Sequence, residues 1–223
     1  MSFSQRYREF FGVGVLLLVL LFPISAGAYE GHESELWTEA GFRYRLNKKV
    51  AMDWRAYWRF RGPVDTTKSN MGQFGLRYRL SKRYSLTVGY RHISKLKDDE
   101  RELAHRFYSS FSARKNWKPF SFSYRLRFQR EGESGGGESN YEIRNRLKAR
   151  WALGKSIRPF ISSDLIAAED KGGWDMDALR MSAGFELPLG PHELALGYRQ
   201  VYPLRQSDDP LKHIVLSAYS YQW

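Results

Sequence analysis

The segment FRYRLNKKVAMDWRAYWRFRG, at residues 42–62, alternates large apolar side chains with charged ones. Phe42 and Tyr44 alternate with Arg43 and Arg45, and after a short polar turn tryptophan and phenylalanine alternate with aspartate and arginine. A period of two places the two sets on opposite faces of a β-strand. The pattern recurs along most of the chain, which restricts the fold to strands with one apolar and one basic face.

The alternation predicts strands at residues 35–46, 50–61, 71–80, 84–93, 102–114, 119–130, 141–151, 158–168, 178–187, 192–202 and 211–223. Short turns after the first, third, fifth, seventh and ninth of these strands alternate with longer loops rich in Gly, Ser, Asp and Glu. The hairpin sequence at residues 43–49 recurs at residues 77–83, which indicates a repeated hairpin. Short turns at one edge and long loops at the other are typical of outer-membrane barrels.

These features predict an all-β fold, a transmembrane antiparallel up-and-down β-barrel with aromatic residues toward lipid and arginines toward the lumen. A soluble β-sandwich also alternates, but it explains neither the many outward aromatics nor the alternation of loop lengths. Single-chain bacterial barrels have an even number of strands. We therefore expect about 12 strands, with 10 acceptable, through an extra strand at residues 29–35 or a different division elsewhere. Residues 158–168 fit neither face cleanly.

The N-terminus has the layout of a cleaved signal peptide. Arg6 and Arg8 precede an apolar run at residues 10–24, and Ser25-Ala26-Gly27-Ala28 follows. A membrane anchor is the alternative, but the run is shorter than the roughly 20 residues that a helical span needs. We expect cleavage after Ala28, which leaves a barrel domain at residues 29–223 in the bacterial outer membrane.

The C-terminal strand alternates and ends on an aromatic residue, Trp223. This looks like the signal that the barrel-assembly machinery reads, so that machinery is an expected partner, together with outer-membrane lipid and lipopolysaccharide.

The chain carries a formal net charge of +12. It has no cysteine, and this absence excludes disulfides and thiol chemistry. Nucleic acid is not an expected partner, because the chain is exported and its aromatics and arginines lie on opposite faces.

The sequence also resembles a known family. Leu36-Trp37 opens the first strand, and arginine-rich strands follow lysine-rich turns. His105-Arg106-Phe107-Tyr108, the stretch at residues 122–128, and Arg144-Asn145-Arg146-Leu147 add to the likeness. These stretches are similar to the bacterial outer-membrane proteins grouped as domain of unknown function 2490. The resemblance implies an outer-membrane barrel and supplies no activity and no functional residues.

The arginines of the inner face are the candidate site. A lumen lined with arginine attracts anions, so a small anionic solute is an expected partner. The alternative is that arginine–carboxylate pairs only fill a narrow barrel. Like charges on neighbouring strands repel, so an anion or an acidic segment has to compensate them. The candidate anion-facing residues are Arg43, Arg45, Arg55, Arg59, Arg77, Arg79, Arg91, Arg106, Arg125, Arg127, Arg144 and Arg146.

Two further function classes remain open. A lipid-modifying enzyme would need a serine–histidine pair, but the pairs His105/Ser109 and His213/Ser217 lie about 13 Å apart along a strand and need a cross-strand partner. The acidic, glycine-rich loops leave a structural or adhesive role open. No catalytic residue, metal or cofactor is predicted, since the histidines are scattered and the acidic loop at residues 170–177 is more readily explained as solvated.

Overall fold

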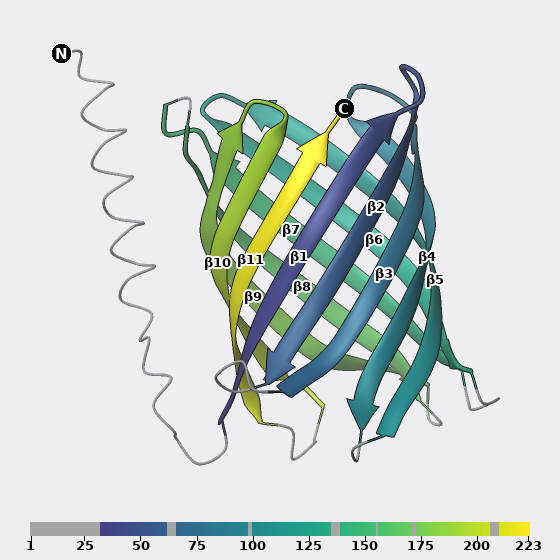
Figure 1. Cartoon of the computed structure of the whole chain (residues 1–223). Coiled ribbons are helices and arrows are strands. Elements are labelled where there is room, and N and C mark those ends of the chain that lie inside the picture. Colours follow the sequence, from purple (N-terminus) through teal and green to yellow (C-terminus); the bar gives the residue numbers. More distant parts are fainter. Residues whose placement is uncertain are drawn as a thin grey trace.

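The computed structural model describes residues 32–61, 66–97, 100–134, 139–154, 156–170, 173–205 and 210–223, which form a closed β-barrel (Figure 1). The predicted signal peptide, residues 1–28, lies outside the described residues. The strands are β1 (His32–Arg45), β2 (Val50–Arg61), β3 (Thr66–Arg79), β4 (Tyr84–Lys97), β5 (Glu100–Trp117), β6 (Phe120–Glu133), β7 (Asn140–Trp151), β8 (Arg158–Asp170), β9 (Gly173–Leu189), β10 (His192–Pro203) and β11 (Leu211–Gln222).

Strands that follow one another in the chain pair antiparallel, and a parallel pair of β1 and β11 closes the barrel. This pair runs in register from His32 opposite Leu211 to Arg43 opposite Gln222. Beyond it, Arg45 N donates to Trp223 O at 3.1 Å and Trp223 N donates to Arg43 O at 2.9 Å. Strand direction alternates along the chain, so the first and last of an odd number of strands point the same way and can pair only in parallel.

The expected count of 12 strands, or of 10, is wrong, because the described residues form 11. The expectation relied on the even number that is usual when the first and last strands pair antiparallel. The segment at residues 29–35 supplies no additional strand among the described residues, since His32–Glu35 belong to β1. The segment at residues 158–168 lies within β8, which has a register shift between Ile166 and Ala167.

The short turns and the C-terminus lie at one edge of the barrel, and the ends of the strands that flank the longer loops lie at the other (Figure 1). The repeated hairpin uses one local device twice. Asn47 Oδ1 accepts the backbone N–H of Val50 at 2.8 Å, and Ser81 Oγ accepts that of Tyr84 at 3.2 Å. The backbone repeats as well, with Leu46 N donating to Val50 O and Leu80 N to Tyr84 O, both at 3.0 Å. The sequence repeat is therefore a repeat of structure.

The outer face of the barrel is apolar around its circumference. Side chains on this face that remain well exposed include Phe42, Tyr44, Trp54, Trp58, Phe74, Leu76, Tyr78, Leu86, Val88, Phe107, Phe122, Leu126, Phe128, Leu194, Leu196, Val215 and Tyr219. Water-soluble surfaces rarely carry contiguous apolar area of this extent. A barrel that spans a bilayer presents such a band to lipid.

At two places on the inner face, a pair of glycines that lie directly opposite each other on neighbouring strands makes room for an aromatic ring. Gly75 pairs with Gly89 under the ring of Tyr108, and a Cβ on Gly89 would lie 2.4 Å from Tyr108 Cζ. Gly184 pairs with Gly197 in the same way under Phe160. Each ring in turn carries a cation on its face, with Arg127 Cζ 4.1 Å from the Tyr108 centroid and Lys148 Nζ 3.9 Å from the Phe160 centroid. The missing side chains let these lumenal rings approach the wall closely.

Substitution of Gly184 tests this packing. A Cβ there would lie 2.2 Å from Leu196 O and 2.6 Å from Gly197 Cα, which are backbone atoms that cannot turn aside. We expect Gly184→Ala to lower the free energy of unfolding by about 2 kcal/mol through overpacking. The measurement is the urea midpoint of the barrel refolded in lipid vesicles. Gly72→Ala is the matched control, since its Cβ would meet nothing within 4 Å, and equal effects at both positions would contradict the packing argument.

Candidate functional site

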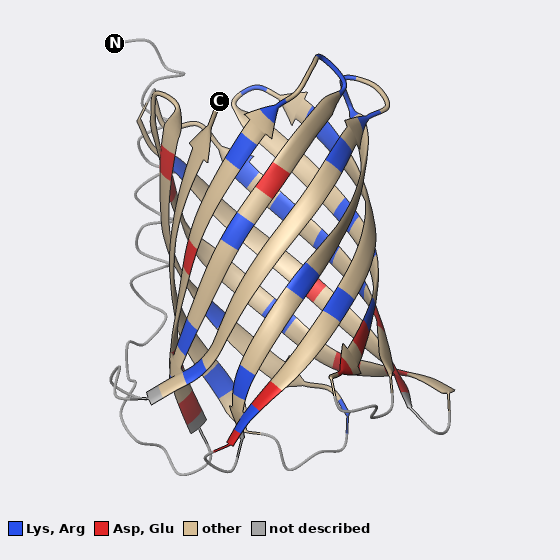
Figure 2. Cartoon of the chain, turned by 45° about the vertical axis from the view of Figure 1, so that its right-hand side comes forward, with Lys and Arg blue, Asp and Glu red and all other residues tan. Residues whose placement is uncertain are grey.

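The arginines of the predicted site lie on the inner face of the barrel. Ion pairs between strands that are not neighbours identify this face, because only the concave side lets such side chains meet. Lys68 of β3 reaches Glu35 of β1 at 2.6 Å, and Lys95 of β4 reaches Glu131 of β6 at 2.5 Å. Figure 2 shows Lys and Arg distributed along the strands and concentrated in turns at the short-turn edge. Arg45 and Arg79 are exposed at that edge, and the other predicted arginines lie deeper in the wall.

One group of predicted arginines is neutralised by carboxylates. Asp53 is 5% exposed and forms ion pairs with two arginines. Its Oδ1 lies 2.5 Å from Arg43 Nε, and its Oδ2 lies 3.3 Å from Arg77 Nε. Arg55 Nη1 lies 2.7 Å from Glu39 Oε1. These pairs bind neighbouring strands to one another, as the structural alternative predicts. Arg106 and Arg144 are paired as well, with Glu131 and Asp164 respectively.

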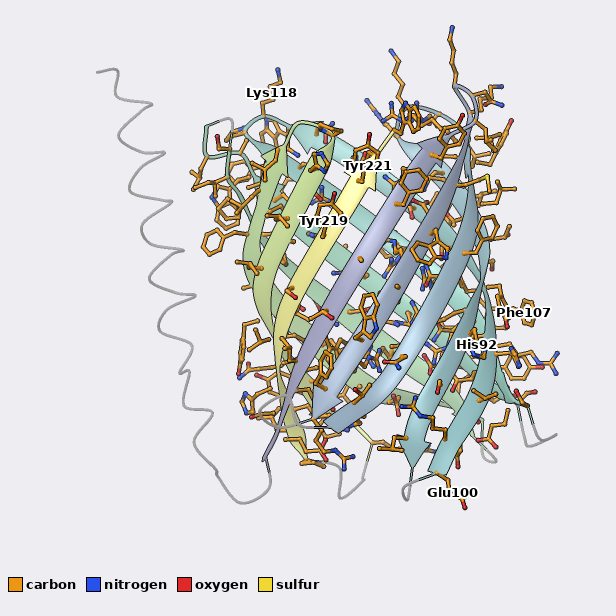
Figure 3. All side chains as sticks on the ribbon, in the orientation of Figure 1. His92, Glu100, Phe107, Lys118, Tyr219 and Tyr221 are labelled. Carbon is orange, nitrogen blue, oxygen red and sulfur yellow. The ribbon has the colours of Figure 1, made fainter. Side chains whose placement is uncertain are left out.

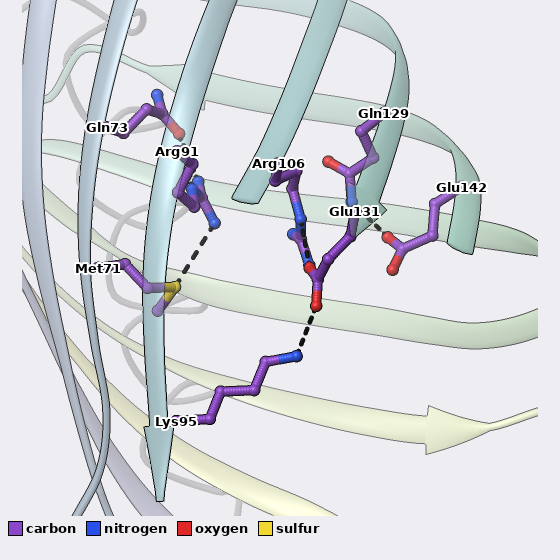
Figure 4. Close-up of polar contacts among 8 residues, drawn as sticks. All are labelled: Met71, Gln73, Arg91, Lys95, Arg106, Gln129, Glu131 and Glu142. Carbon is purple, nitrogen blue, oxygen red and sulfur yellow. Dashed lines mark hydrogen bonds and ion pairs between the residues drawn. The ribbon is translucent and has the colours of Figure 1, made fainter. Parts of the chain in front are cut away.

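The close-up of the pair at Glu131 shows how one carboxylate serves two strands (Figure 4). Glu131 of β6 accepts hydrogen bonds from Lys95 of β4 and from Arg106 of β5, and it is 9% exposed. Arg91 lies beside this group and is held differently. Its Nε donates to Gln73 Oε1 at 3.0 Å and its Nη1 approaches Met71 Sδ at 3.8 Å, so a neutral amide and a thioether replace a carboxylate.

A second group of inner-face arginines forms no ion pair with any described carboxylate. Aromatic faces and hydroxyl groups hold several of them: Arg91 lies over Tyr57 at 4.6 Å, Arg127 donates to Ser110 at 3.0 Å, and Arg199 donates to Ser182 at 2.9 Å. These contacts fix the position of a guanidinium without cancelling its charge. The members of this group that are not exposed are Arg59, Arg91, Arg125, Arg127, Arg146, Arg180 and Arg199.

Trp37 of β1 is surrounded by members of this group. The guanidinium carbons of Arg59, Arg199 and Arg180 lie 3.9, 5.2 and 5.9 Å from its ring centroid. Its Nε1 donates to Glu35 Oε2 at 2.5 Å, which fixes the indole in the wall. Arginines from three strands, β2, β9 and β10, thus converge on one indole.

Like charges face one another directly at three positions of the ladder, one between β4 and β5 and two between β6 and β7. An opposed pair of like charges destabilises a sheet, since the Cβ atoms lie only about 5 Å apart. The pairs are Arg91 with Arg106, Arg127 with Arg144, and Arg125 with Arg146. The Nε–H groups of Arg125 and Arg146 are buried and donate no hydrogen bond to the part of the chain that the structure describes. Two of the three opposed arginine pairs therefore lie where β6 and β7 meet.

Asp164 of β8 is the carboxylate nearest to this concentration of charge. It is 3% exposed, it forms an ion pair with Arg144, and its direct cross-strand neighbours are Arg146 and Arg180. Its Oδ1 accepts no hydrogen bond from a described residue. One buried carboxylate thus stands among several guanidinium groups, and their charges exceed what it can balance.

Sequence reasoning missed the aromatic members of this site. Trp37, Tyr57 and Tyr108 were not assigned to the lumen, and neither was Arg180. Trp37 and Tyr57 occupy the same phase as the arginines of their strands, so strict alternation carried the necessary signal. General expectation places aromatics toward lipid, and it concealed that signal.

On the outer face, His105 contacts a serine from beyond its own strand, the kind of partner that the sequence analysis required. His105 Nε2 lies 2.8 Å from Ser134 Oγ, and His105 Nδ1 lies 2.5 Å from Tyr90 OH. The serine that contacts His105 is therefore Ser134, just after β6, and not Ser109. Among the described residues no cluster of three or more His, Asp or Glu could hold a metal ion. The described ranges also contain no helix long and apolar enough to cross a membrane.

A family profile described as "Protein of unknown function (DUF2490)" matches residues 34–211. The chain belongs to the DUF2490 family. The resemblance seen in the sequence is thereby confirmed. No curated protein sequence matches this DUF2490 chain.

Several solved structures are similar to the DUF2490 barrel at low identity. They include a "bacterial polysaccharide outer membrane secretin" (14% identity, TM-score 0.48, covering 79% of this chain and 64% of that one). OmpT of Vibrio cholerae has 9% identity and a TM-score of 0.43, covering 74% and 60%. The NanC porin has 11% identity and a TM-score of 0.44, covering 74% and 87%. The chain thus spans less than two thirds of the first two.

Substitution of Asp164 tests the charge balance of the lumen. Asp164→Asn leaves the surrounding arginines buried without the carboxylate, and we expect the free energy of unfolding to fall by about 3 kcal/mol. Urea unfolding in lipid vesicles measures the change. Glu193→Gln is the control, because Glu193 and Arg158 form a looser, more exposed pair at 3.8 Å, whose loss should cost at most about 0.5 kcal/mol. A smaller loss at Asp164 than at Glu193 would rule out this account.

Proposed function

We propose that this protein is an outer-membrane β-barrel whose lumen attracts and admits small anions. The observation that carries the proposal is the set of directly opposed arginines on β6 and β7, Arg127 with Arg144 and Arg125 with Arg146. A wall built only for stability would alternate charge across neighbouring strands. Here the like charges are retained, and the described carboxylates that could balance them are too few.

Placement in the outer membrane is supported by the apolar outer face and the closed ladder of strands. The predicted signal peptide and the alternating terminal strand that ends at Trp223 fit export and insertion by the barrel-assembly machinery. By the usual rule for such barrels, the short turns face the periplasm and the long-loop edge faces outward. An anion then enters past the loop edge and meets the central arginines before the basic short-turn edge.

Arginine can attract an anion without trapping it when its charge is only partly neutralised. Arg127 keeps its guanidinium against Tyr108 and Ser110, and Arg199 keeps its own against Trp37 and Ser182. Both side chains are therefore positioned in advance. A passing anion exchanges one set of water and guanidinium contacts for the next, with little rearrangement of the wall.

Single-channel recording in planar bilayers tests the proposal. We expect the wild-type barrel to be anion-selective and Arg125→Gln/Arg146→Gln to lower the anion-to-cation permeability ratio about fivefold. Each charge contributes about 0.5 kcal/mol to an anion about 8 Å away through water. The readout is the reversal potential in a salt gradient.

The control removes a pair without changing net charge. Arg55→Gln/Glu39→Gln eliminates a lumenal ion pair, and its reversal potential should match that of the wild type. A folded wild-type barrel that carries no current and binds neither sulfate nor phosphate would refute the proposal. A barrel with the same selectivity after Arg125 and Arg146 are neutralised would also refute it.

A second candidate, a lipid-modifying enzyme, is favoured by one observation. Ser134, His105 and Tyr90 form a hydrogen-bonded series on the outer face near the long-loop edge. In this chemistry His105 takes the proton of Ser134 as the hydroxyl attacks a lipid ester, and it returns that proton to the deacylated lipid alcohol, which leaves. Water, with His105 again as the base, then hydrolyses the acyl-serine ester, which releases a fatty acid and restores the Ser134 hydroxyl. Tyr90 orients the imidazole through its other nitrogen.

Lipid analysis decides this second candidate. If the series is catalytic, cells that express the wild type release fatty acid from an outer-membrane lipid, and cells that express Ser134→Ala do not. Ser109→Ala is the matched control, since Ser109 also faces outward but does not touch His105. Mass spectrometry of the lipids at equal barrel abundance gives the readout. Identical profiles for wild type and Ser134→Ala exclude the enzyme.

A further inference from the structure

Arg101 of β5 and Arg130 of β6 face outward, whereas the other strand arginines occupy the inner phase. Their outward direction follows from the strand pairing, because residues directly across the ladder, or an even number of positions apart on one strand, point to the same face. Arg130 lies directly across from Phe107, which projects from the outer wall (Figure 3), and Arg101 is six residues from Phe107 on the same strand. Both arginines are exposed. Charge on a lipid-facing surface is costly, so its presence in a membrane protein indicates a function.

The outward surface between these two arginines carries Leu103 beside polar side chains and no described acid. His92 and His105 pair across the ladder with ring centroids 5.5 Å apart. Arg130 Nη2 donates to Ser139 Oγ at 3.1 Å, and its guanidinium lies 5.7 Å from the ring centroid of Tyr141. Arg101 Nη1 lies 3.4 Å from Ser94 Oγ. Neither arginine forms an ion pair with a described carboxylate, so donor capacity remains available to an anionic partner.

An apolar groove of ≈ 480 Å³ adjoins this surface on the side toward the short turns. Phe74, Val88, Phe107 and Phe128 line it, and Gly89, which has no side chain, contributes to its lining. Arg130 and Tyr90 belong to the same lining and stand in the ladder row nearest the histidines. The arrangement offers an apolar channel to an acyl chain and a cation at the head of that channel.

The separation of the arginines selects among lipids. Six residues of strand separate Arg101 from the row of Arg130, which corresponds to about 20 Å along the wall. Two side chains at that distance are poorly placed to grip one phosphate together, but they can each hold one of two phosphates at opposite ends of a headgroup. A glycerophospholipid such as phosphatidylglycerol offers one phosphate, whereas the acylated disaccharide of lipid A offers two.

We propose that the outer face of β4, β5 and β6 binds lipid A, with its phosphates on Arg101 and Arg130 and an acyl chain in the groove. The inference rests on the proposed outward orientation of the long-loop edge, since lipid A occupies the outer leaflet. It does not depend on anion passage through the lumen, nor on whether Ser134 cleaves an ester. His105 and His92 lie between the two phosphates and contact the sugar region.

Binding to the full-length barrel in detergent micelles tests the site, with native mass spectrometry as the readout. The probes are bis-phosphorylated lipid A, mono-phosphorylated lipid A and phosphatidylglycerol. We expect the bis-phosphorylated species to bind about tenfold more tightly than the mono-phosphorylated one, as loss of a hydrogen-bonded charge predicts. Arg101→Gln/Arg130→Gln should remove this preference. Lys115→Gln is the matched control, because Lys115 lies at the opposite end of β5 and lines a separate groove.

The outcomes separate this site from general lipid association and from the proposed orientation. Equal binding of phosphatidylglycerol and lipid A, or an unchanged preference in the double variant, overturns the proposal. Since the chain has no cysteine, Glu100→Cys can be labelled on intact cells with an impermeant maleimide. Glu100 lies at the long-loop edge (Figure 3), so labelling supports the orientation and its absence overturns both orientation and site. Conductance of Arg101→Gln/Arg130→Gln should equal that of the wild type, which keeps the lumen proposal independent.

Discussion

Backbone amides and carbonyls in a bilayer have no water to bind, and the closed ladder of this barrel satisfies them strand by strand. The rest of the structure depends on that ladder. In the closed ladder, successive side chains of each strand point to opposite faces. One set therefore faces lipid, and the other set faces a narrow interior. Because the parallel contact between β1 and β11 completes the ring, no strand edge is left for another chain.

The interior that results is crowded with cations, and the wall handles them in two ways. Carboxylates such as Asp53 and Glu131 each bind cations from two strands and act as crosslinks. Aromatic rings such as Trp37 and Tyr108 support guanidinium groups without removing their charge. The first device gives rigidity, and the second preserves a positive potential. The paired glycines belong to the second device, because they create the space in which the ring of Tyr108 lies against the wall.

Much of the fold follows from the sequence, because a period of two is a direct readout of strand faces. The strands, the alternation of turns and loops, and the lumenal position of arginines such as Arg125 and Arg146 were predicted. The alternation itself marked eleven segments, and the expectation of 12 came from the even-number rule, which fails here because the first and last strands pair in parallel. The sequence assigned no face to the segment at residues 158–168, and the structure of β8 gives the reason. Phe160 and Ile166 are buried inside while Ile161 is exposed outside, so apolar residues stand on both faces.

The candidate site was predictable only in part. Alternation places an arginine on the inner face, but the choice of carboxylate depends on diagonal and cross-strand geometry. Asp164 illustrates this, as it faces Arg146 and Arg180 in the ladder and yet forms its ion pair with Arg144. The outward phase of Arg101 and Arg130 was readable from the sequence once the strand ends were known. It was overlooked because both residues lie at or beyond the predicted ends of β5 and β6.

The parallel seam has a topological consequence for any molecule joined to the barrel. β1 starts at the long-loop edge and β11 finishes at the short-turn edge, so the two termini of the ladder lie at opposite edges of the barrel. A barrel with an even number of strands returns the chain to the side from which it started. With the barrel in a bilayer, a domain attached ahead of β1 and one attached behind β11 would therefore lie on opposite sides of the membrane. The barrel would then connect the two domains covalently across it.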